Sequence, residues 1–146
     1  MDLLASVIGQ VEKPDDRKPV LVIKPEFWDG VLQLDKFSHI IVLWWITERD
    51  NPEDRSNLRD YPPQESAELS GVFASRSPAR PTPIGHSIVG IESLNDKTRE
   101  IRIDQIDAFD GTPIVDIKPY MPTSDRVDNA IVPEWFRSNV PRYTKT

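Results

Sequence analysis

The apolar residues of this chain fall into short, separated runs that are rich in branched side chains. Runs of this length are typical of β-strands. In IRIDQI, Ile101 and Ile103 alternate with Arg102 and Asp104, which predicts a strand with one face in water. The predicted strands are Leu3–Val11, Val20–Ile23, His39–Ile46, Val72–Ala74, Ile88–Leu94, Ile101–Ile106 and Ile114–Ile117.

The run HIIVLWWI is apolar throughout and predicts a central strand that is covered on both faces. Neighbouring side chains of a strand point to opposite faces, so Trp44 and Trp45 are expected to point apart. One of them should fill the core, and the other should lie under another element or at an oligomer contact. His39 is expected to be a buried structural residue, bonded to backbone.

Helix signals are weak. Residues 25–37 predict a single turn, and the run VPEWFRS predicts a short helix with Pro133 at its first position. Residues 47–70 form a long polar segment without an apolar face, as is typical of lids, binding loops and disordered segments. We therefore predict one domain over residues 1–146: a mainly β, single-sheet β-barrel with short helices and a long polar loop.

Composition narrows the possible chemistry. The chain has 146 residues, no cysteine and two histidines, which excludes disulfides and thiolate nucleophiles and argues against a metal site. A net charge of −6 argues against nucleic-acid binding by overall charge, although a local basic patch is compatible with it. No apolar run approaches the roughly 18 residues of a membrane span, and no signal peptide is evident. We expect a cytoplasmic protein with no membrane partner.

The stretch GVFASRSPARPTPIGHS places Arg76 and Arg80 among Pro78, Pro81 and Pro83. Proline fixes its own φ and restricts the residue before it, so this loop is expected to be preorganised. A guanidinium held in this way can bind a carboxylate or a phosphate as a fork. The alternative is that both arginines pair with the chain's own acids and the prolines only stiffen a turn. The residues alone do not decide between the two.

A second cluster of candidate residues lies in DAFDGTPIVDIKPYMP. Asp110-Gly111 between two apolar runs predicts a hairpin turn. Asp107, Asp110 and Thr112 would place three oxygen-bearing side chains at one strand end, suited to ribose hydroxyls or an ammonium group. The alternative is a tight turn with no further role. Because no glycine-rich phosphate-binding motif is present, a nucleotide-like ligand would have to be held by arginines, acids and backbone.

Three motifs in this order, DKFSHIIVLWWITE, GVFASRSPARPTPIGHS and DAFDGTPIVDIKPYMP, resemble those of the TsaA-like family, also called the TrmO family. The resemblance covers most of residues 3–122. It implies a homodimeric β-barrel that binds S-adenosylmethionine near the dimer contact. It also implies a methyltransferase that modifies the exocyclic nitrogen of threonylcarbamoyl-adenosine next to the tRNA anticodon. A non-catalytic barrel that binds S-adenosylmethionine or RNA is the alternative.

Carried over position by position, the family's cofactor contacts fall on Thr47, Glu48, Arg76, His86, Asp107, Asp110, Gly111 and Thr112. The chain departs from the family pattern at Thr47, Thr82 and His86, where histidine, asparagine and leucine or methionine are usual. On this resemblance Arg76 would pair with the cofactor's carboxylate, and Glu48 or Asp110 would supply a general base. Arg80 and Lys118 are the candidate substrate-binding residues, with Arg126 and the arginines of residues 47–70 completing a basic patch for tRNA phosphates.

Overall fold

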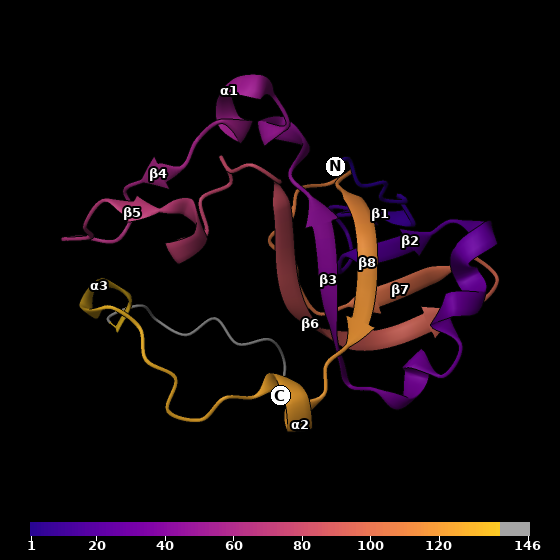
Figure 1. The fold of residues 1–146 in the computed structure, drawn as a ribbon. Coiled ribbons are helices and arrows are strands. Elements are labelled where there is room, and N and C mark those ends of the chain that lie inside the picture. The colour runs from indigo at the N-terminus through magenta and orange to yellow at the C-terminus, as the bar shows by residue number, and fades with distance from the viewer. Residues whose placement is uncertain (138–146) are drawn as a thin grey trace. The chain divides into compact units, whose positions relative to one another are not determined.

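The computed structural model describes residues 1–137, which form two compact units (Figure 1). The first, here called the sheet unit, contains Met1–Trp45 and Ile84–Met121. The second unit contains Ile46–Pro83 and the described residues from 122 to 137. Each unit is described by itself.

The sheet unit is built from six antiparallel strands that close into a ring in the order β1-β2-β7-β6-β3-β8. The strands are β1 (Gly9–Glu12), β2 (Val20–Ile23), β3 (His39–Trp45), β6 (Ile84–Asn95), β7 (Glu100–Ile103) and β8 (Pro113–Pro119). Two 3-10 helices, η1 (Pro25–Val31) and η2 (Leu34–Lys36), connect β2 to β3. The prediction of a mainly β chain with short helices is confirmed.

Three of the predicted strands are wrong in whole or in part, and one of them, Ile101–Ile106, ends early, at Ile103. The segment predicted from Leu3 enters the sheet only at Gly9, because the residues before Ile8 are exposed and have no strand partner. Residues Val72–Ala74 form a 3-10 helix, η4, rather than a strand. Only Val72 of that run is buried, whereas Phe73 is 82% exposed. The run therefore has one buried apolar side chain and lacks the row of buried side chains that a strand of the core would have.

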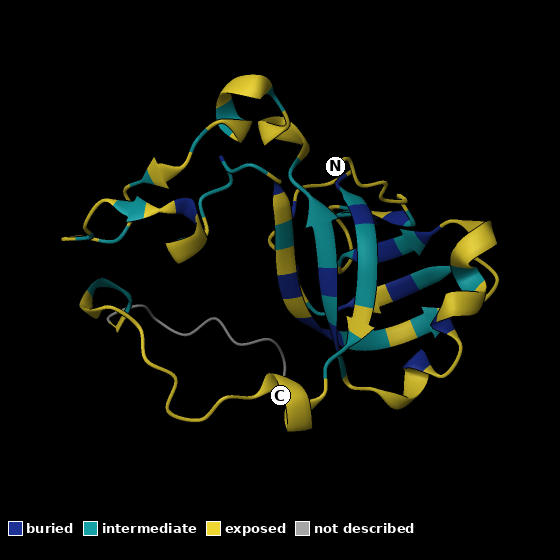
Figure 2. Cartoon of the chain, in the orientation of Figure 1, coloured by how far each residue is buried: buried dark blue, intermediate teal, exposed yellow. Residues whose placement is uncertain are grey.

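The core fills the inside of the ring, and buried residues alternate with less buried ones along β1, β7 and the first part of β3 (Figure 2). On β7, Ile101 and Ile103 are fully buried, while Arg102 is exposed. On β3, Ile40 and Val42 are fully buried, but their outward neighbours are half-buried, so the prediction that both faces are covered was wrong. Trp44 follows the inward row and packs against the core.

The turn at Asp110 does not close a hairpin. β7 pairs with β2 and β6, whereas β8 pairs with β1 and β3, so the two strands that flank the turn are not neighbours. The turn itself is present, with Gly111 at φ +82°. A local turn signal cannot distinguish a hairpin from a loop that crosses the end of the ring, since the pairing partners lie far away in sequence.

His39 begins β3 and is half-buried rather than buried. Its Nδ1 lies 2.7 Å from the hydroxyl oxygen of Ser38. Its backbone carbonyl accepts a hydrogen bond from the backbone N–H of Tyr120, which extends the contact between β3 and the end of β8.

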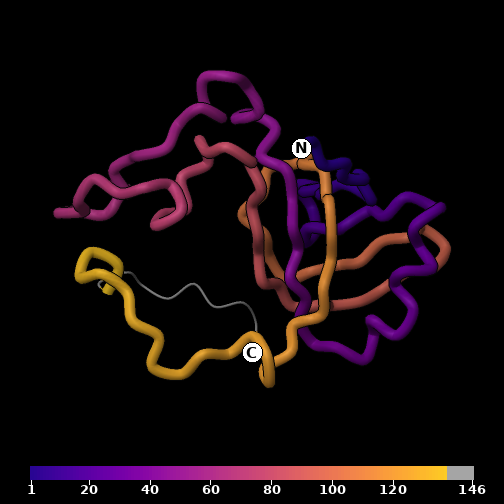
Figure 3. The backbone as a smooth tube through the Cα atoms, viewed as in Figure 1, coloured from indigo at the N-terminus to yellow at the C-terminus, as the bar shows by residue number. Residues whose placement is uncertain are grey.

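The first segment of the second unit, Ile46–Pro83, connects two neighbouring strands of the sheet unit. The chain leaves the ring after Trp45 and returns at Ile84, and these two residues are register partners on β3 and β6 (Figure 3). The backbone N–H of Ile46 donates to the carbonyl of Pro83 at 2.8 Å, which continues the pairing by one step. Residues 46–83 are therefore an excursion between two paired strands.

Short elements organise the segment that was predicted to be a long polar loop. They are η3 (Thr47–Arg49), α1 (Pro52–Arg55), β4 (Arg59–Asp60), β5 (Ser70–Gly71) and η4 (Val72–Ala74). β4 and β5 form a separate two-stranded sheet, so the prediction of a single sheet was wrong. The side chain of Asn51 caps α1 by accepting from the backbone N–H of Asp54 at 2.9 Å.

The C-terminal part of the second unit contains α2 (Pro122–Asp125) and α3 (Glu134–Arg137). The helix predicted at VPEWFRS is confirmed as α3, with Pro133 immediately before its first residue. The carbonyl of Pro133 accepts from the backbone N–H of Phe136 at 3.0 Å, which closes its first turn.

Candidate functional site

The residues predicted to form a site divide between the two units. The sheet unit carries His86, Asp107, Asp110, Gly111, Thr112 and Lys118, and the second unit carries Thr47, Glu48, Arg76 and Arg80. Within each unit, their hydrogen bonds distinguish side chains that are committed to the fold from side chains that remain available to a ligand.

Asp107 is held by a chain of hydrogen bonds that starts inside the ring. The indole Nε1 of Trp44 on β3 donates to Ser87 Oγ on β6 at 3.1 Å, and Ser87 Oγ donates to Asp107 Oδ1 at 2.6 Å. Ser87 is one of the few buried polar residues, while Asp107 is exposed. Because its only described bond uses Oδ1, the carboxylate is fixed in position and retains Oδ2 for a ligand.

The turn that follows is docked onto β1. The backbone N–H of Lys13 donates to Asp110 Oδ1 at 2.8 Å, and the backbone N–H of Gly111 donates to the carbonyl of Val11 at 2.7 Å. Val11 in turn donates to the carbonyl of Thr112 at 2.9 Å. Thr112 is buried, so its side chain packs inside the unit, whereas Asp110 is exposed. Asp107 and Asp110 are thus anchored to different strands of the ring.

The two remaining candidates of the sheet unit lie on other parts of the ring. His86 is exposed on β6, where it is the register partner of Leu43. Lys118 is exposed on β8 and pairs with Asp116, with 3.2 Å between Nζ and Oδ2. No described hydrogen bond connects either residue to Asp107 or Asp110.

The two arginines of the proline-rich loop differ in their contacts. Arg80 is half-buried and donates to three backbone carbonyls, those of Val72 at 2.7 Å, Ser75 at 3.2 Å and Ser77 at 3.1 Å. Arg76 is exposed and makes no hydrogen bond or ion pair with any described residue. Arg80 therefore fixes the backbone of the loop, and the loop presents Arg76.

Neither arginine pairs with an acid among residues 1–137, which was the alternative left open by the sequence. Most of the other cations assigned to a phosphate-binding patch are occupied. The ion pairs are Arg49–Asp54 at 3.6 Å, Arg55–Asp50 at 2.9 Å and Arg126–Asp128 at 2.8 Å.

Thr47 and Glu48 open η3, directly after the chain has left β3. Both are exposed, and the carboxylate of Glu48 has no partner among the residues that the structure describes. Of the two candidate bases, Glu48 is therefore more available to take a proton, because the carboxylate of Asp110 already accepts a hydrogen bond from the backbone N–H of Lys13.

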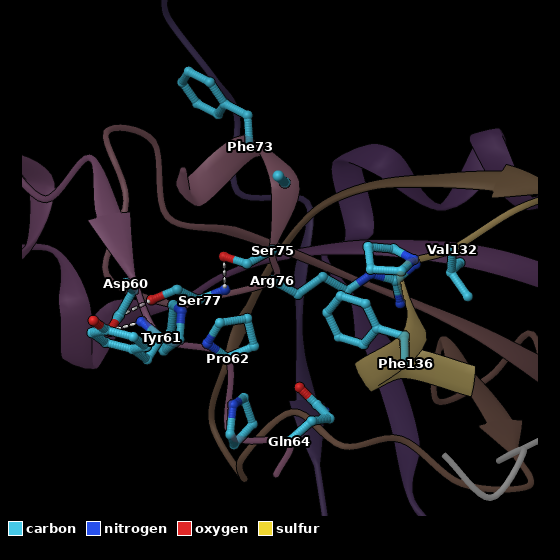
Figure 4. Close-up of a pocket in the computed structure, with 14 residues that line it drawn as sticks. Asp60, Tyr61, Pro62, Gln64, Phe73, Ser75, Arg76, Ser77, Val132 and Phe136 are labelled. Carbon is cyan, nitrogen blue, oxygen red and sulfur yellow. Dashed lines mark hydrogen bonds between the residues drawn. The ribbon is translucent and has the colours of Figure 1, made fainter. Parts of the chain in front are cut away.

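Arg76 lines a cavity of about 890 Å³ within the second unit (Figure 4). Its side chain extends from the loop toward Val132 and Phe136. The walls come from the segment after β4, from η4 with the proline-rich loop, and from the end of the described chain. They consist of Asp60, Tyr61, Pro62, Pro63, Gln64, Phe73, Ala74, Ser75, Arg76, Ser77, Pro78, Val132, Pro133 and Phe136.

The sequence reasoning missed most of these walls. Asp60 joins two of them, because its carboxylate accepts from the hydroxyl of Ser77 and from the backbone N–H of Tyr61, each at 2.9 Å. Only the aromatic residue before a proline pair in YPPQ, and the aromatic pair in VPEWFRS, could have indicated a lining of flat side chains.

Two structural features are absent from residues 1–137. No helix in this part of the chain has both the length and the apolar character that crossing a membrane requires. The same residues contain no group of three or more His, Cys, Asp or Glu side chains that could hold a metal ion.

The family model of the tRNA-methyltransferase O N-terminal domain matches residues 9–126, and the chain belongs to this family. The matched range includes β1 through α2 and contains every residue predicted to bind cofactor or substrate. The resemblance seen in the three sequence motifs is therefore confirmed.

Individual relatives agree with this assignment. A “Probable S-adenosyl-L-methionine-binding protein” of Archaeoglobus fulgidus is 46% identical over 120 residues, covering 82% of this chain and 31% of that protein. An “S-adenosyl-L-methionine-binding protein” of the same organism is 40% identical over 108 residues, and the match covers 74% of this chain and 73% of that protein.

Among solved structures, the crystal structure of TrmO from Pseudomonas aeruginosa matches with a TM-score of 0.69 and 27% identity. The match covers 92% of this chain and 62% of that chain. This chain thus spans about three fifths of the TrmO structure and about a third of the first Archaeoglobus relative.

Proposed function

We propose that this protein is an S-adenosylmethionine-dependent methyltransferase that modifies the exocyclic nitrogen of threonylcarbamoyl-adenosine next to the tRNA anticodon. The observation that carries the proposal is the family match over residues 9–126, because it includes Ile46–Pro83 of the second unit, most of the sheet unit and all the candidate site residues. The proposal includes a cytoplasmic location and tRNA as the partner.

The residues present fit the chemical groups of S-adenosylmethionine, which has a carboxylate, an ammonium group and ribose hydroxyls. Arg76 offers a guanidinium with no described partner, suited to the carboxylate as a charge-assisted fork. Asp107 offers a fixed carboxylate with one uncommitted oxygen, suited to ribose hydroxyls or the ammonium group. Gly111, at φ +82°, keeps the backbone beside Asp110 open because it carries no side chain.

When bound, S-adenosylmethionine supplies a methyl group activated by its sulfonium. The residues of this chain would orient the acceptor nitrogen and remove its proton, since little covalent chemistry falls to the protein in such a transfer. A carbamoylated amine is a poor nucleophile, so a base that takes its proton as the carbon–nitrogen bond forms would help. We assign this role to Glu48, whose carboxylate is free of described contacts, rather than to Asp110.

The departures from the family pattern affect different parts of this assignment. His86 lies in the β6 ladder, so a contact through its backbone would tolerate the change of side chain. Thr47 is exposed at the start of η3 and does not supply the imidazole that is usual there. Thr82 is exposed in the proline-rich loop.

The function can be tested in two steps. Calorimetric titration with S-adenosylmethionine should give saturable heat, which Arg76→Ala should remove while the fold, monitored by circular dichroism, stays intact. Incubation with cofactor and threonylcarbamoylated tRNA, followed by mass spectrometry of the nucleosides, should then detect one added methyl group. Cofactor binding without methylation would instead support a non-catalytic S-adenosylmethionine-binding module.

A further inference from the structure

The proposed cofactor contacts leave most of the cavity in the second unit unassigned. Of the eight candidate cofactor residues, only Arg76 lines it. Moreover, its third wall is formed by Val132, Pro133 and Phe136, which lie beyond the residues matched by the family model. This wall is a feature that the family assignment does not explain.

The lining is rich in flat, rigid side chains. Tyr61 and Phe136 come from separate walls, and prolines stand beside both of them. Aromatic faces of this kind stack on the unpaired bases of single-stranded nucleic acid, whatever the base. Duplex RNA does not expose those faces, so a lining of this type selects for an unstacked nucleotide.

The walls are also held in place. Asp60 binds the hydroxyl of Ser77 and the backbone N–H of Tyr61, which ties the segment of Tyr61 to the proline-rich loop. The same loop is braced from inside by the three carbonyl contacts of Arg80. A preformed surface loses less conformational entropy on binding a ligand than a flexible loop does.

One polar atom of the lining lacks a partner. The side-chain oxygen of Gln64 is buried and accepts no hydrogen bond from the described residues. A buried acceptor without a donor is costly, so a turn of this side chain that brings its oxygen to an N–H group of a ligand would be favoured. Nucleobases present amino or imino N–H groups along their edges.

We propose that this cavity binds one unpaired nucleotide of the RNA substrate. Its base stacks on Phe136 and Tyr61, and its N–H edge donates to the side-chain oxygen of Gln64. Arg76, which lines the same cavity, remains the anchor for the cofactor carboxylate. This inference rests on the proposed function, which makes RNA the substrate.

The test separates RNA binding from cofactor binding. Fluorescence anisotropy would measure the affinity for a labelled anticodon stem-loop RNA and for a blunt duplex with the sequence of its stem. Calorimetry would measure the affinity for S-adenosylmethionine. We expect Phe136→Ala to weaken stem-loop binding about tenfold, in line with the loss of one stacked ring, and Phe136→Tyr to restore it.

The controls test whether the effects on RNA affinity and on cofactor affinity are separate. Phe136→Ala should leave cofactor affinity unchanged, whereas Arg76→Ala should abolish cofactor binding. Phe27→Ala, which removes an exposed ring from η1 in the sheet unit, should change neither affinity. Duplex binding should be weaker and should not respond to Phe136→Ala.

Each other outcome has a distinct meaning. If the wild type binds the stem-loop and Phe136→Ala binds it equally well, the inference is overturned and the proposed function stands. If Phe136→Ala lowers cofactor affinity instead, the cavity holds the cofactor and the inference is again overturned. If the wild type binds no RNA, the proposed substrate is wrong and the inference falls with it. Circular dichroism on each variant, with Tyr61→Ala as a second ring deletion, excludes loss of fold as the cause.

Discussion

The indole of Trp44 lies directly against Gly85, its register partner on the adjacent strand β6. A Cβ at residue 85 would stand 2.6 Å from the indole carbons Cη2 and Cζ2, closer than real side chains approach one another. Because glycine has no side chain, the Trp44 indole can lie over residue 85 and donate its hydrogen bond to Ser87.

The first prediction is that Gly85→Ala destabilises the protein by about 1–3 kcal/mol, because the added methyl group forces the indole or the backbone to move. The measurement is urea unfolding followed by tryptophan fluorescence. Gly30→Ala is the matched control, since a Cβ there would meet no atom within 4 Å. Equal stability of Gly85→Ala and the wild type would show that the Trp44 indole has room to move.

The second prediction concerns Ser87, which connects Trp44 to Asp107. Ser87→Ala leaves the indole N–H without its acceptor in a part-buried position, so we expect a loss of about 1–3 kcal/mol in the free energy of unfolding. Ser93→Ala, at an exposed position of the same strand, should change stability by less than about 0.5 kcal/mol.

Ser87→Ala also has a functional readout. The substitution releases Asp107 Oδ1 from its 2.6 Å hydrogen bond, so the carboxylate is no longer held in one orientation. If Asp107 binds the cofactor as proposed, the affinity for S-adenosylmethionine should fall. Unchanged affinity, in a variant that is destabilised as expected, would remove Asp107 from the cofactor site.

Sequence patterns predicted features that depend on neighbouring residues, such as the buried face of a strand. They missed features that depend on contacts between residues far apart in sequence, such as which strands pair. The alternation of Ile101 and Ile103 with Arg102 was enough to place β7 and its buried face. The hairpin at Asp110 was wrong because the partners of β7 and β8 lie elsewhere in the chain. The same limit hid the contact of Ser87 with Asp107, since twenty residues separate them in sequence.

The two arginines of the proline-rich loop illustrate the same limit for the site. In sequence, Arg76 and Arg80 have similar neighbours, and only the family resemblance assigned them to ligands, Arg76 to the cofactor and Arg80 to the substrate. The fold distinguishes them, because three carbonyls converge on Arg80 and no described group contacts Arg76. The loop conformation decides which arginine forms hydrogen bonds with the backbone, and the sequence does not show that conformation.

The third prediction separates these two arginines. Arg80→Ala should lower the free energy of unfolding by roughly 1.5–3 kcal/mol, as expected for hydrogen bonds from a charged donor. Arg76→Ala should change it by less than about 0.5 kcal/mol. Thermal unfolding of both variants, at matched concentration, makes the comparison. A larger destabilisation by Arg76→Ala than by Arg80→Ala would contradict the assignment of their roles.

The fourth prediction concerns the proposed homodimer. Two apolar side chains, Ile84 and Ile88, stand 43% and 42% exposed on β6, on either side of His86. Their register partners on β3 are Trp45 and Ile41, which are half-buried. Apolar groups that gather on neighbouring strands of one outer face are typical of an interface between proteins. We propose that this face forms the contact between two copies of the chain.

A charge placed on that face should separate the copies, because it would be buried without a partner in the dimer. We expect the wild type to sediment as a dimer and Ile88→Lys to sediment as a monomer with an unchanged circular dichroism spectrum. Leu32→Lys is the control, because Leu32 is 80% exposed in the connection between η1 and η2 and is not a residue of β3 or β6. A monomeric wild type would rule out the dimer, and a dimer that survives Ile88→Lys would place the contact on another surface of the molecule.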